Sequence, residues 1–196
     1  MLRCGQKSGI VVFYTNLKEV KMNEGTLGHL IRWNHELNRR EILLGKRKTS
    51  EFNGTLSGPG GKKEPGESIL ECLVREFREE VGVEIYKGSA LHVATIDYHR
   101  PTDRGNELFW RVHYFNITEW HGVPKPMDGF ESVDWYPLEN MPYSEMHPDV
   151  KHWFPRLLLG KGHNLLKGNV FYMDKDRSIV GSANFDFVSR PNTSNA

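Results

Sequence analysis

Hydrophobic residues in this chain occur in short runs, most of which are rich in β-branched and aromatic side chains. Such runs, bounded by glycine, proline or polar residues, predict β-strands. We expect strands at residues 10–14, 41–45, 91–98, 108–117, 133–136, 170–173 and 185–188. The polar stretch 100–106 contains a glycine and predicts a hairpin between its neighbouring strands, and the last two runs predict a closing hairpin.

Three segments instead place apolar residues three or four positions apart, the spacing of a helix that buries one face. In residues 68–81 this pattern is strong, and Gly82 stands where the helix would end. A second helix is expected from His147-Pro148-Asp149 onward, with an apolar face of Trp153, Phe154, Leu157 and Leu158. Residues 25–38 predict a third helix, packed on the surface or serving as a lid or an oligomer contact, with apolar residues Leu27, Leu30, Ile31 and Leu37.

The segments between these elements indicate a single domain. Residues 53–66 are rich in glycine and proline and predict a loop. The chain shows no internal repeat and no linker to a second domain, and its 196 residues are enough for one sizeable core. We therefore expect one α/β domain over residues 1–189, followed by a polar tail at 190–196.

Composition and charge narrow the classes of function. The chain has 26 basic and 25 acidic residues and a net charge of +1. This balance argues against a general binder of nucleic acid polymers or membrane surfaces, but it leaves a small anionic ligand open. Two cysteines, Cys4 and Cys72, cannot build a disulfide framework, and Cys72 is interpreted as a buried thiol. Because no apolar run suits a membrane helix or a secretion signal, we expect a cytoplasmic protein.

Three carboxylates in the strongest predicted helix are candidates for chemistry. Glu76, Glu79 and Glu80 are three or four positions apart and share one stripe of the helix. An apolar stripe beside them would bury the helix against a sheet: Ile69, Leu70, Leu73, Phe77 and Val81. Neighbouring carboxylates repel one another by roughly 0.2–0.5 kcal/mol per pair, which a shared hard cation such as Mg²⁺ or Mn²⁺ would offset. The alternative is a solvated acidic face balanced by Arg75 and Arg78.

The spacing of the surrounding residues favours the cation site. Between Gly61 and Val83 the chain resembles the box of the Nudix hydrolases at every defined position. The seven fixed identities are Gly61, Glu67, Arg75, Glu76, Glu79, Glu80 and Gly82. This resemblance implies an α/β/α sandwich with a mixed sheet, in which the box forms a loop–helix–loop. It also implies an enzyme that hydrolyses a nucleoside diphosphate linked to another moiety, by attack of water at phosphorus.

The resemblance also implies roles for single residues. By this likeness, the metal ligands are the backbone carbonyl of Gly60 and the carboxylates of Glu76, Glu79 and Glu80, and the cofactor is Mg²⁺, with Mn²⁺ as a substitute. Glu79 or Glu80 would then also act in catalysis, while Arg75 orients the carboxylates.

Family members differ in the origin of the catalytic base, which comes either from the box or from a later loop. Glu131 precedes Trp135-Tyr136 at about the position of the later glutamate. Arg75 is expected to act through Glu67 and not by touching the substrate. The sequence therefore leaves Glu131 and the box carboxylates as alternative bases.

Segments outside the box resemble one group within the family, the MutT homologues that are oxidised purine nucleoside triphosphate diphosphatases. The similar segments are 42–47, 135–138, 141–142, 147–149, 153–158 and 171–188. Residues 16–40 have no counterpart and are interpreted as an insertion. The likeness otherwise covers most of the chain.

Two departures from that group concern the substrate pocket. The group usually has Trp-Pro-Asp-Asp where this chain has His147-Pro148-Asp149-Val150, and Asn where this chain has Ser57. In the group the two aspartates hydrogen-bond an oxidised purine, so the loss of one at Val150 should relax or redirect base choice. The candidate substrate contacts are Arg47, Ser57, Lys62, His147 and Asp149. The alternatives are a solvated strand end for Arg47 and a plain helix N-terminal role for Asp149.

Three functions are consistent with these residues. The first is hydrolysis of a nucleoside triphosphate, such as an 8-oxo-dGTP-like oxidised purine, to the monophosphate and pyrophosphate. The second is hydrolysis of another nucleoside diphosphate derivative, such as ADP-ribose or a dinucleoside polyphosphate. The third is a non-catalytic nucleotide-binding module, which the complete set of box carboxylates argues against. The partner expected in each case is a small nucleotide, and the sequence leaves the oligomeric state open.

Overall fold

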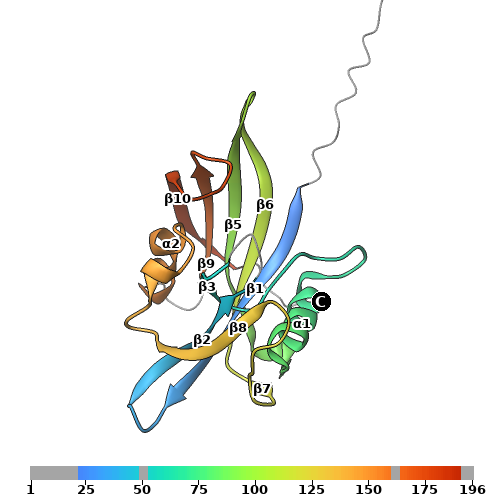
Figure 1. The fold of residues 1–196 in the computed structure, drawn as a ribbon, viewed down its shortest axis with the longest axis vertical. Coiled ribbons are helices and arrows are strands. Elements are labelled where there is room, and N and C mark those ends of the chain that lie inside the picture. The colour runs from blue at the N-terminus through green and yellow to red at the C-terminus, as the bar shows by residue number, and fades with distance from the viewer. Residues whose placement is uncertain (1–21, 49–52, 160–163, 191–196) are drawn as a thin grey trace, which may run out of the picture.

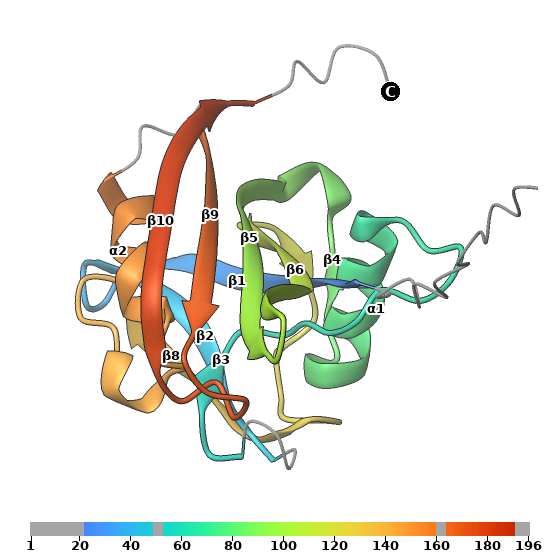
Figure 2. The same ribbon diagram turned by 90° about the horizontal axis from the view of Figure 1, so that it is seen from above.

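The computed structural model describes residues 22–48, 53–159 and 164–190. A large mixed sheet crosses the molecule, with one helix on each side (Figures 1 and 2). The strands are β1 (Asn23–Asn34), β2 (Arg39–Arg47), β3 (Leu56–Ser57), β4 (Glu84–Ile85), β5 (Ala90–Thr102), β6 (Gly105–Ile117), β7 (Trp120–His121), β8 (Phe130–Pro137), β9 (Asn164–Tyr172) and β10 (Val180–Ser189). The helices are α1 (Ile69–Val81), α2 (Val150–Leu159) and the short 3₁₀ turns η1 (Lys87–Ser89) and η2 (Tyr143–Glu145).

The main sheet has eight strands in the order β10-β9-β5-β6-β1-β2-β3, with β8 paired to β2. The pairs β1–β6 and β5–β9 are parallel and the other pairs are antiparallel. Strands β4 and β7 form a separate pair. Figure 2 shows α1 and α2 on opposite sides of the sheet. The expected α/β/α sandwich with a mixed sheet is confirmed.

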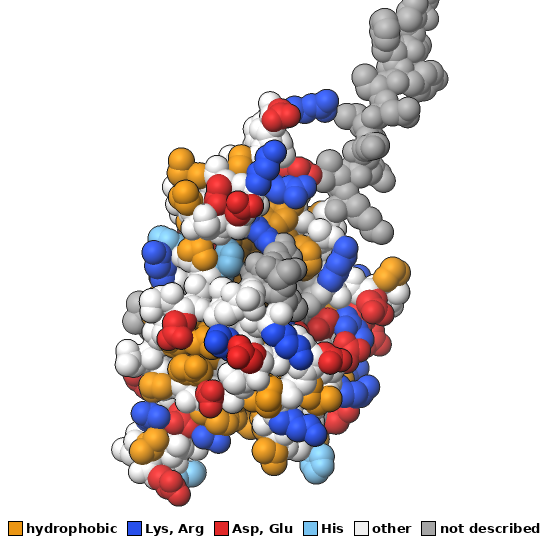
Figure 3. All heavy atoms as spheres, viewed as in Figure 1, with side chains coloured by type: hydrophobic (Ala, Val, Ile, Leu, Met, Phe, Trp, Pro, Cys, Tyr) orange, Lys and Arg blue, Asp and Glu red, His pale blue; other side chains and the backbone are white. Residues whose placement is uncertain are grey.

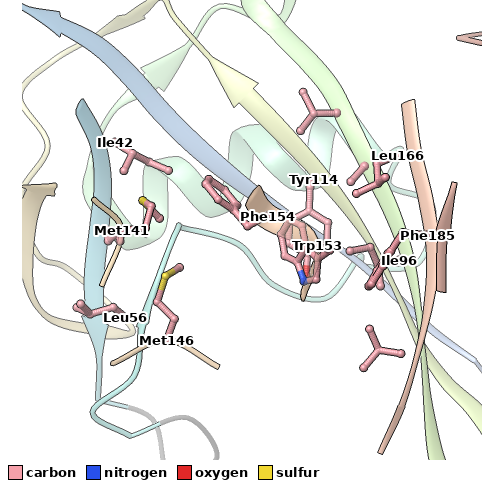
Figure 4. Close-up of a cluster of buried hydrophobic side chains, with 14 of the residues drawn as sticks. Ile42, Leu56, Ile96, Tyr114, Met141, Met146, Trp153, Phe154, Leu166 and Phe185 are labelled. Atoms are coloured by element: carbon pink, nitrogen blue, oxygen red, sulfur yellow. The ribbon is translucent and has the colours of Figure 1, made fainter. Parts of the chain in front are cut away.

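Each face of the sheet carries its own hydrophobic cluster. The larger cluster lies between the sheet and α2, and Figure 4 shows Trp153 and Phe154 beside Tyr114 of the sheet. The rings of Tyr114 and Trp153 are 4.4 Å apart. The smaller cluster buries the apolar stripe of α1 and contains Leu30, Leu43, Leu73, Phe77, Val81 and Phe130. The sheet is therefore buried on both faces where it supports the two helices.

The helix expected over residues 25–38 is wrong, because this segment forms strand β1 and the turn that follows it. The early part of β1 pairs with β6 and its last residues pair with β2, so it lies inside the sheet. Residues buried on both faces of a strand do not alternate, which is why the spacing imitates a helix. Gly28 allows β1 to pack closely against α1, because a Cβ at this position would lie 2.4 Å from the ring of Phe77. The described part of the supposed insertion 16–40 is thus integral to the sheet.

The other helices and strands predicted on described residues are confirmed, with strands longer than expected at β5, β6, β9 and β10, whereas the predicted loop 53–66 contains the short strand β3. Ser68 caps α1 and forms a capping box with Glu71, and Gly82 ends the helix with φ 69°. The strand expected at 10–14 and most of the tail 190–196 lie outside the described residues. Within the described part of the chain, no helix is long and apolar enough to cross a membrane.

Candidate active site

Helix α1 faces the sheet with one side and presents carboxylates along its edge. Glu76 and Glu80 lie beside the apolar stripe and are each only 8% exposed, whereas the side chain of Glu79 is 51% exposed. The helix therefore holds two buried carboxylates and one exposed carboxylate at the same edge. Together with Arg75 and Gly60, they are called the box site below.

Glu80 is hydrogen-bonded from two directions. Arg47 Nη1 donates to its Oε1, and the backbone N–H of Gly60 donates to its Oε2 over 2.8 Å. Burial raises the pKa of Glu80 to about 7, although Arg47 and the Gly60 N–H favour the charged form. Gly129 is required nearby, because it has φ 88° and a Cβ there would lie 2.5 Å from Glu80 Oε1. Ionised Glu80 therefore depends on neighbouring positive charge.

Glu76 lies against the glycine loop that precedes the helix. A Cβ at Gly61 would lie 2.4 Å from Glu76 Oε1, so a residue without a side chain is needed at this approach. Arg75 Nη1 donates to the same oxygen over 2.8 Å. Burial raises the pKa of Glu76 above its ordinary value, and Arg75 opposes that shift. The first glycine of the box is thus explained by the carboxylate that it accommodates.

Arg75 connects the carboxylates of the box. Its Nε and Nη2 donate to Glu67 over 2.9 and 3.1 Å, and its Nη1 donates to Glu79 over 3.0 Å as well as to Glu76. Hydrogen bonding by Arg75 also holds the pKa of Glu67 below its ordinary value. Arg75 therefore contacts Glu76 and Glu79 directly as well as Glu67, whereas the sequence led us to expect that it acts through Glu67.

The donors of the box site suit a hard divalent cation. Glu76, Glu80 and the carbonyl of Gly60 offer only oxygen, which Mg²⁺ and Mn²⁺ prefer. Desolvation raises the pKa of both buried carboxylates, so a cation that neutralises them would be favourable. The described residues contain no group of three or more His, Cys, Asp or Glu side chains arranged as a cage. Mg²⁺ commonly binds one or two carboxylates and completes its shell with waters and phosphates, so these residues fit it.

Arg47 joins the box site to the neighbouring loop. Besides the carboxylate contact described above, its Nε donates to Ser57 Oγ over 2.8 Å. Its Nη2 donates to the carbonyls of Gly58 and Gly60 over 3.0 and 3.1 Å, and its guanidinium lies 4.3 Å from the centre of the Phe130 ring. Arg47 is only 9% exposed. Its guanidinium therefore fixes the position of the loop relative to the box carboxylates.

A cavity of about 250 Å³ opens beside the box site, on the sheet face that carries α2. Gly60 and Gly61 line it, as do Ser57, His147 and Val150. Its aromatic lining consists of Tyr98, Phe109, Trp110, Tyr114, Trp153 and Tyr172. We refer to it as the aromatic cavity. The structure thus brings four of the five candidate substrate residues into one cavity, namely Arg47, Ser57, His147 and Asp149, but not Lys62.

Asp149 also lines this cavity, where it is 2% exposed and surrounded by donors. Tyr98 and Trp153 donate to its Oδ2 over 3.0 and 2.8 Å. Tyr172 donates to its Oδ1 over 3.2 Å, and His147 Nδ1 contacts the same oxygen. A carboxylate has about four acceptor positions, and four protein groups occupy them here. A base could hydrogen-bond Asp149 only if one of these groups moved away.

Two other predicted residues are exposed at the surface. Glu131 is an exposed residue of β8 whose side chain pairs with Lys46 over 3.3 Å. Lys46 precedes Arg47 on β2, where the pairing with β8 is irregular, and Lys46 is exposed whereas Arg47 is buried. Lys62 is exposed, and its backbone carbonyl accepts a hydrogen bond from Arg75 over 3.1 Å. The structure does not bring Glu131 into the group formed by Glu76 and Glu80.

Several residues of the cavity were not anticipated from the sequence. Tyr98, Tyr114 and Tyr172 come from three strands and form one polar network, in which Tyr114 and Tyr98 are joined by a 2.5 Å hydrogen bond. Burial raises the pKa of all three hydroxyls. Phe109 packs against the larger hydrophobic cluster and also lines the cavity. No local signal marks these residues, because strand alternation alone does not show which face bears a cavity.

The structure has a mixed sheet between two helices, and one capped helix presents buried carboxylates to a glycine loop. These features define the Nudix fold. The model of the NUDIX domain family matches residues 31–157, more than half of the chain. The chain therefore belongs to the Nudix family and is a hydrolase.

Known proteins similar to this chain show several substrates on the same fold. The oxidized purine nucleoside triphosphate hydrolase of Mus musculus is 32% identical over 126 residues, covering 64% of this chain and 76% of that protein. The ADP-ribose pyrophosphatase of Methanocaldococcus jannaschii is 33% identical over 102 residues, covering 52% of this chain and 57% of that protein. The crystal structure of a MutT protein from Bacillus halodurans has a TM-score of 0.67 at 23% identity, covering 84% of this chain and 98% of that one.

Proposed function

We propose that this Nudix hydrolase cleaves a nucleoside triphosphate to the nucleoside monophosphate and pyrophosphate, with Mg²⁺ as cofactor. One observation carries the proposal: the aromatic cavity adjoins the box site through Gly60 and Gly61. A purine ring in the cavity would be stacked among aromatic side chains while its phosphates reach the box carboxylates. The similarity to the mouse oxidised purine nucleoside triphosphate hydrolase supports the same substrate class.

Glu76, Glu80 and the carbonyl of Gly60 would hold the cation. When bound, a divalent cation neutralises phosphate oxygens and makes water a better nucleophile. Mn²⁺ would serve in place of Mg²⁺, because both accept oxygen ligands in this arrangement. Arg47 and Arg75 keep the carboxylates in place, and the glycine loop keeps bulky side chains away from them.

The proton of the attacking water needs an acceptor among the side chains of the box. In the reaction an oxygen–phosphorus bond forms with water, the bridging phosphorus–oxygen bond breaks, and pyrophosphate leaves with the bridging oxygen. Glu79 is our candidate for the base, because it is half exposed and Arg75 fixes it by a 3.0 Å hydrogen bond. Glu131 is the weaker candidate, since its side chain pairs with Lys46.

The test is a panel of nucleotides incubated with Mg²⁺, with kcat/KM measured for each and the products identified by chromatography. The panel contains the ordinary nucleoside triphosphates, 8-oxo-dGTP, ADP-ribose and a diadenosine polyphosphate. We expect a purine nucleoside triphosphate to give the highest kcat/KM and to yield pyrophosphate. Release of inorganic phosphate instead of pyrophosphate, or a highest kcat/KM for ADP-ribose, would refute the proposal.

A second candidate is hydrolysis of ADP-ribose or another nucleoside diphosphate derivative. The similarity to an archaeal ADP-ribose pyrophosphatase favours this alternative, and its products would be AMP and ribose 5-phosphate. The same panel separates the two candidates. Either substrate would be a small nucleotide.

A further inference from the structure

A second pocket of about 170 Å³ adjoins the aromatic cavity and is lined mainly by basic and aromatic side chains. We call it the basic pocket. Its lining residues are Asn23, Arg100, Phe109, Trp110, Lys175 and Arg177. They come from the start of β1, from the β5–β6 hairpin and from the turn between β9 and β10. None of these residues belongs to the box, although Lys175 and Arg177 lie in the segment 171–188 that resembles the MutT homologues.

The charges in this pocket are arranged to favour an anion. The guanidinium groups of Arg100 and Arg177 lie 5.4 and 5.6 Å from the centre of the same Phe109 ring. Both guanidinium groups therefore bring positive charge to the same pocket. The lining includes no carboxylate, and the nearby Glu107 pairs with Arg100 at the longer distance of 3.6 Å. Lys175 adds a further positive charge to the lining.

The basic pocket is continuous with the aromatic cavity, because Phe109, Trp110 and Arg177 line both. It lies away from the box site along the strands. Thr26 pairs with Gly61 of the box, whereas Asn23 lies at the start of β1, roughly 10 Å away at strand geometry. Figure 3 shows basic and acidic side chains together toward the end of the β5–β6 hairpin. A ligand in the aromatic cavity would therefore meet positive charge at two separate places, the divalent cation proposed for the box site and the basic pocket.

We propose that the basic pocket binds a second phosphate group of the nucleotide, attached to the ribose away from the phosphates at the box site. This inference rests on the proposed function only in placing a nucleotide in the aromatic cavity. The ligand is either a phosphate monoester, as in a nucleoside 3′,5′-bisphosphate, or the phosphodiester of a short 5′-phosphorylated oligonucleotide. Both present the same anionic oxygens to Arg100, Lys175 and Arg177.

The test compares dissociation constants for three ligands, measured by calorimetry on the full chain in the presence of Mg²⁺. The ligands are a nucleoside 5′-monophosphate, the matching 3′,5′-bisphosphate and the 5′-phosphorylated dinucleotide, in adenosine and guanosine forms. One charge-assisted contact corresponds to about tenfold in affinity, so we expect that advantage for the bisphosphate or the dinucleotide over the monophosphate. The ligand with the larger advantage identifies the monoester or the diester as the source.

The matched variants are the double substitution Arg100→Met with Lys175→Met and the control Arg104→Met. Arg104 is exposed in the same hairpin but does not line the pocket. Arg177 is left unchanged because its φ of 60° belongs to the turn. The double variant should lose the advantage of the second phosphate while it keeps the affinity for the monophosphate, and Arg104→Met should keep both. Melting temperatures of all variants show whether they are folded.

Two outcomes would overturn this inference. One is an advantage below about threefold for both ligands and both bases, because a direct ionic contact gives more than that. The other is a double variant that weakens the binding of all three ligands equally, which would assign the cations to the phosphates at the box. Failure of the proposed function has a different signature: no nucleoside triphosphate is hydrolysed, although the difference in binding between bisphosphate and monophosphate persists.

Discussion

The box site and the aromatic cavity adjoin each other but are constructed in different ways. The box site takes its carboxylates from a single helix and its carbonyl from the loop just before that helix. The aromatic cavity takes its lining residues from six strands, from α2 and from loops more than a hundred residues apart. Charges and arginine partners fix the first region, whereas packing and a buried hydroxyl network fix the second.

This difference indicates which part of the enzyme is able to change its substrate. The box site tolerates little variation, because Gly61 and Gly129 leave no space for a Cβ next to its carboxylates. In the cavity, a substitution at a single position such as Val150, the first residue of α2, would change the lining. The reaction is thus fixed by a local segment, and the substrate by contacts between distant segments.

The largest expected effect is on the box site. Glu80→Gln should lower kcat by more than about a hundredfold, because the neutral amide is a much poorer ligand for a divalent cation. The exposed Glu79→Gln is the matched variant on the same helix, and it should affect kcat more than it affects Mn²⁺ binding. Mn²⁺ affinity can be measured by electron paramagnetic resonance, independently of turnover. Full activity of Glu80→Gln would remove this residue from the metal site.

The next effect concerns the stability of the cavity. Asp149→Asn replaces one carboxylate oxygen by an amide N–H₂, which then faces either the Tyr98 hydroxyl and the Trp153 indole or the Tyr172 hydroxyl and His147. Leaving buried donors without acceptors costs about 1–3 kcal/mol each, so we expect a total loss of about 2–4 kcal/mol. The free energy of unfolding from urea titration measures this loss. An unchanged value would show that Asp149 is not the centre of the network.

A smaller effect is expected on selectivity between bases. Val150→Asp adds a carboxylate to the cavity beside Asp149, whose acceptor positions are occupied. Its kcat/KM ratio for 8-oxo-dGTP over dGTP should rise by about tenfold, within the 1–3 kcal/mol of a good base contact. Val150→Asn is the neutral control of similar shape. An unchanged ratio in the aspartate variant would show that the base is recognised elsewhere.

The smallest effect is expected at Glu131. Its exposed side chain pairs with Lys46, so Glu131→Gln should lower kcat by less than about threefold, in keeping with the small energies of exposed ion pairs. Lys46→Met is the control for loss of the same pair. A loss of kcat by about a hundredfold in Glu131→Gln alone would identify this residue as the base and remove Glu79 from that role.

The sequence was sufficient to predict the box site because its spacing is local. Ser68, the carboxylates and Gly82 have fixed positions within one helix, and their geometry follows from 3.6 residues per turn. Arg47, which joins Glu80 to Ser57, was predicted only as a substrate contact. No sequence spacing links Arg47 to Glu80, which lies 33 positions later. Strand β1 was mistaken for a helix because its burial on both faces removes the alternation that marks a strand.

The pairing between the glycine loop and β1 has a consequence for hydrogen exchange. The N–H groups of Thr26 and Gly28 donate to the carbonyls of Gly61 and Pro59 over 3.0 and 2.8 Å, and the N–H of Lys63 donates to Glu24 over 2.9 Å. The loop is therefore held like an additional strand beside the centre of the sheet. The amides of Thr26, Gly28 and Lys63 should exchange with deuterium only when the whole domain unfolds, not through local opening. The glycine loop beside the box site is therefore rigid before any nucleotide binds.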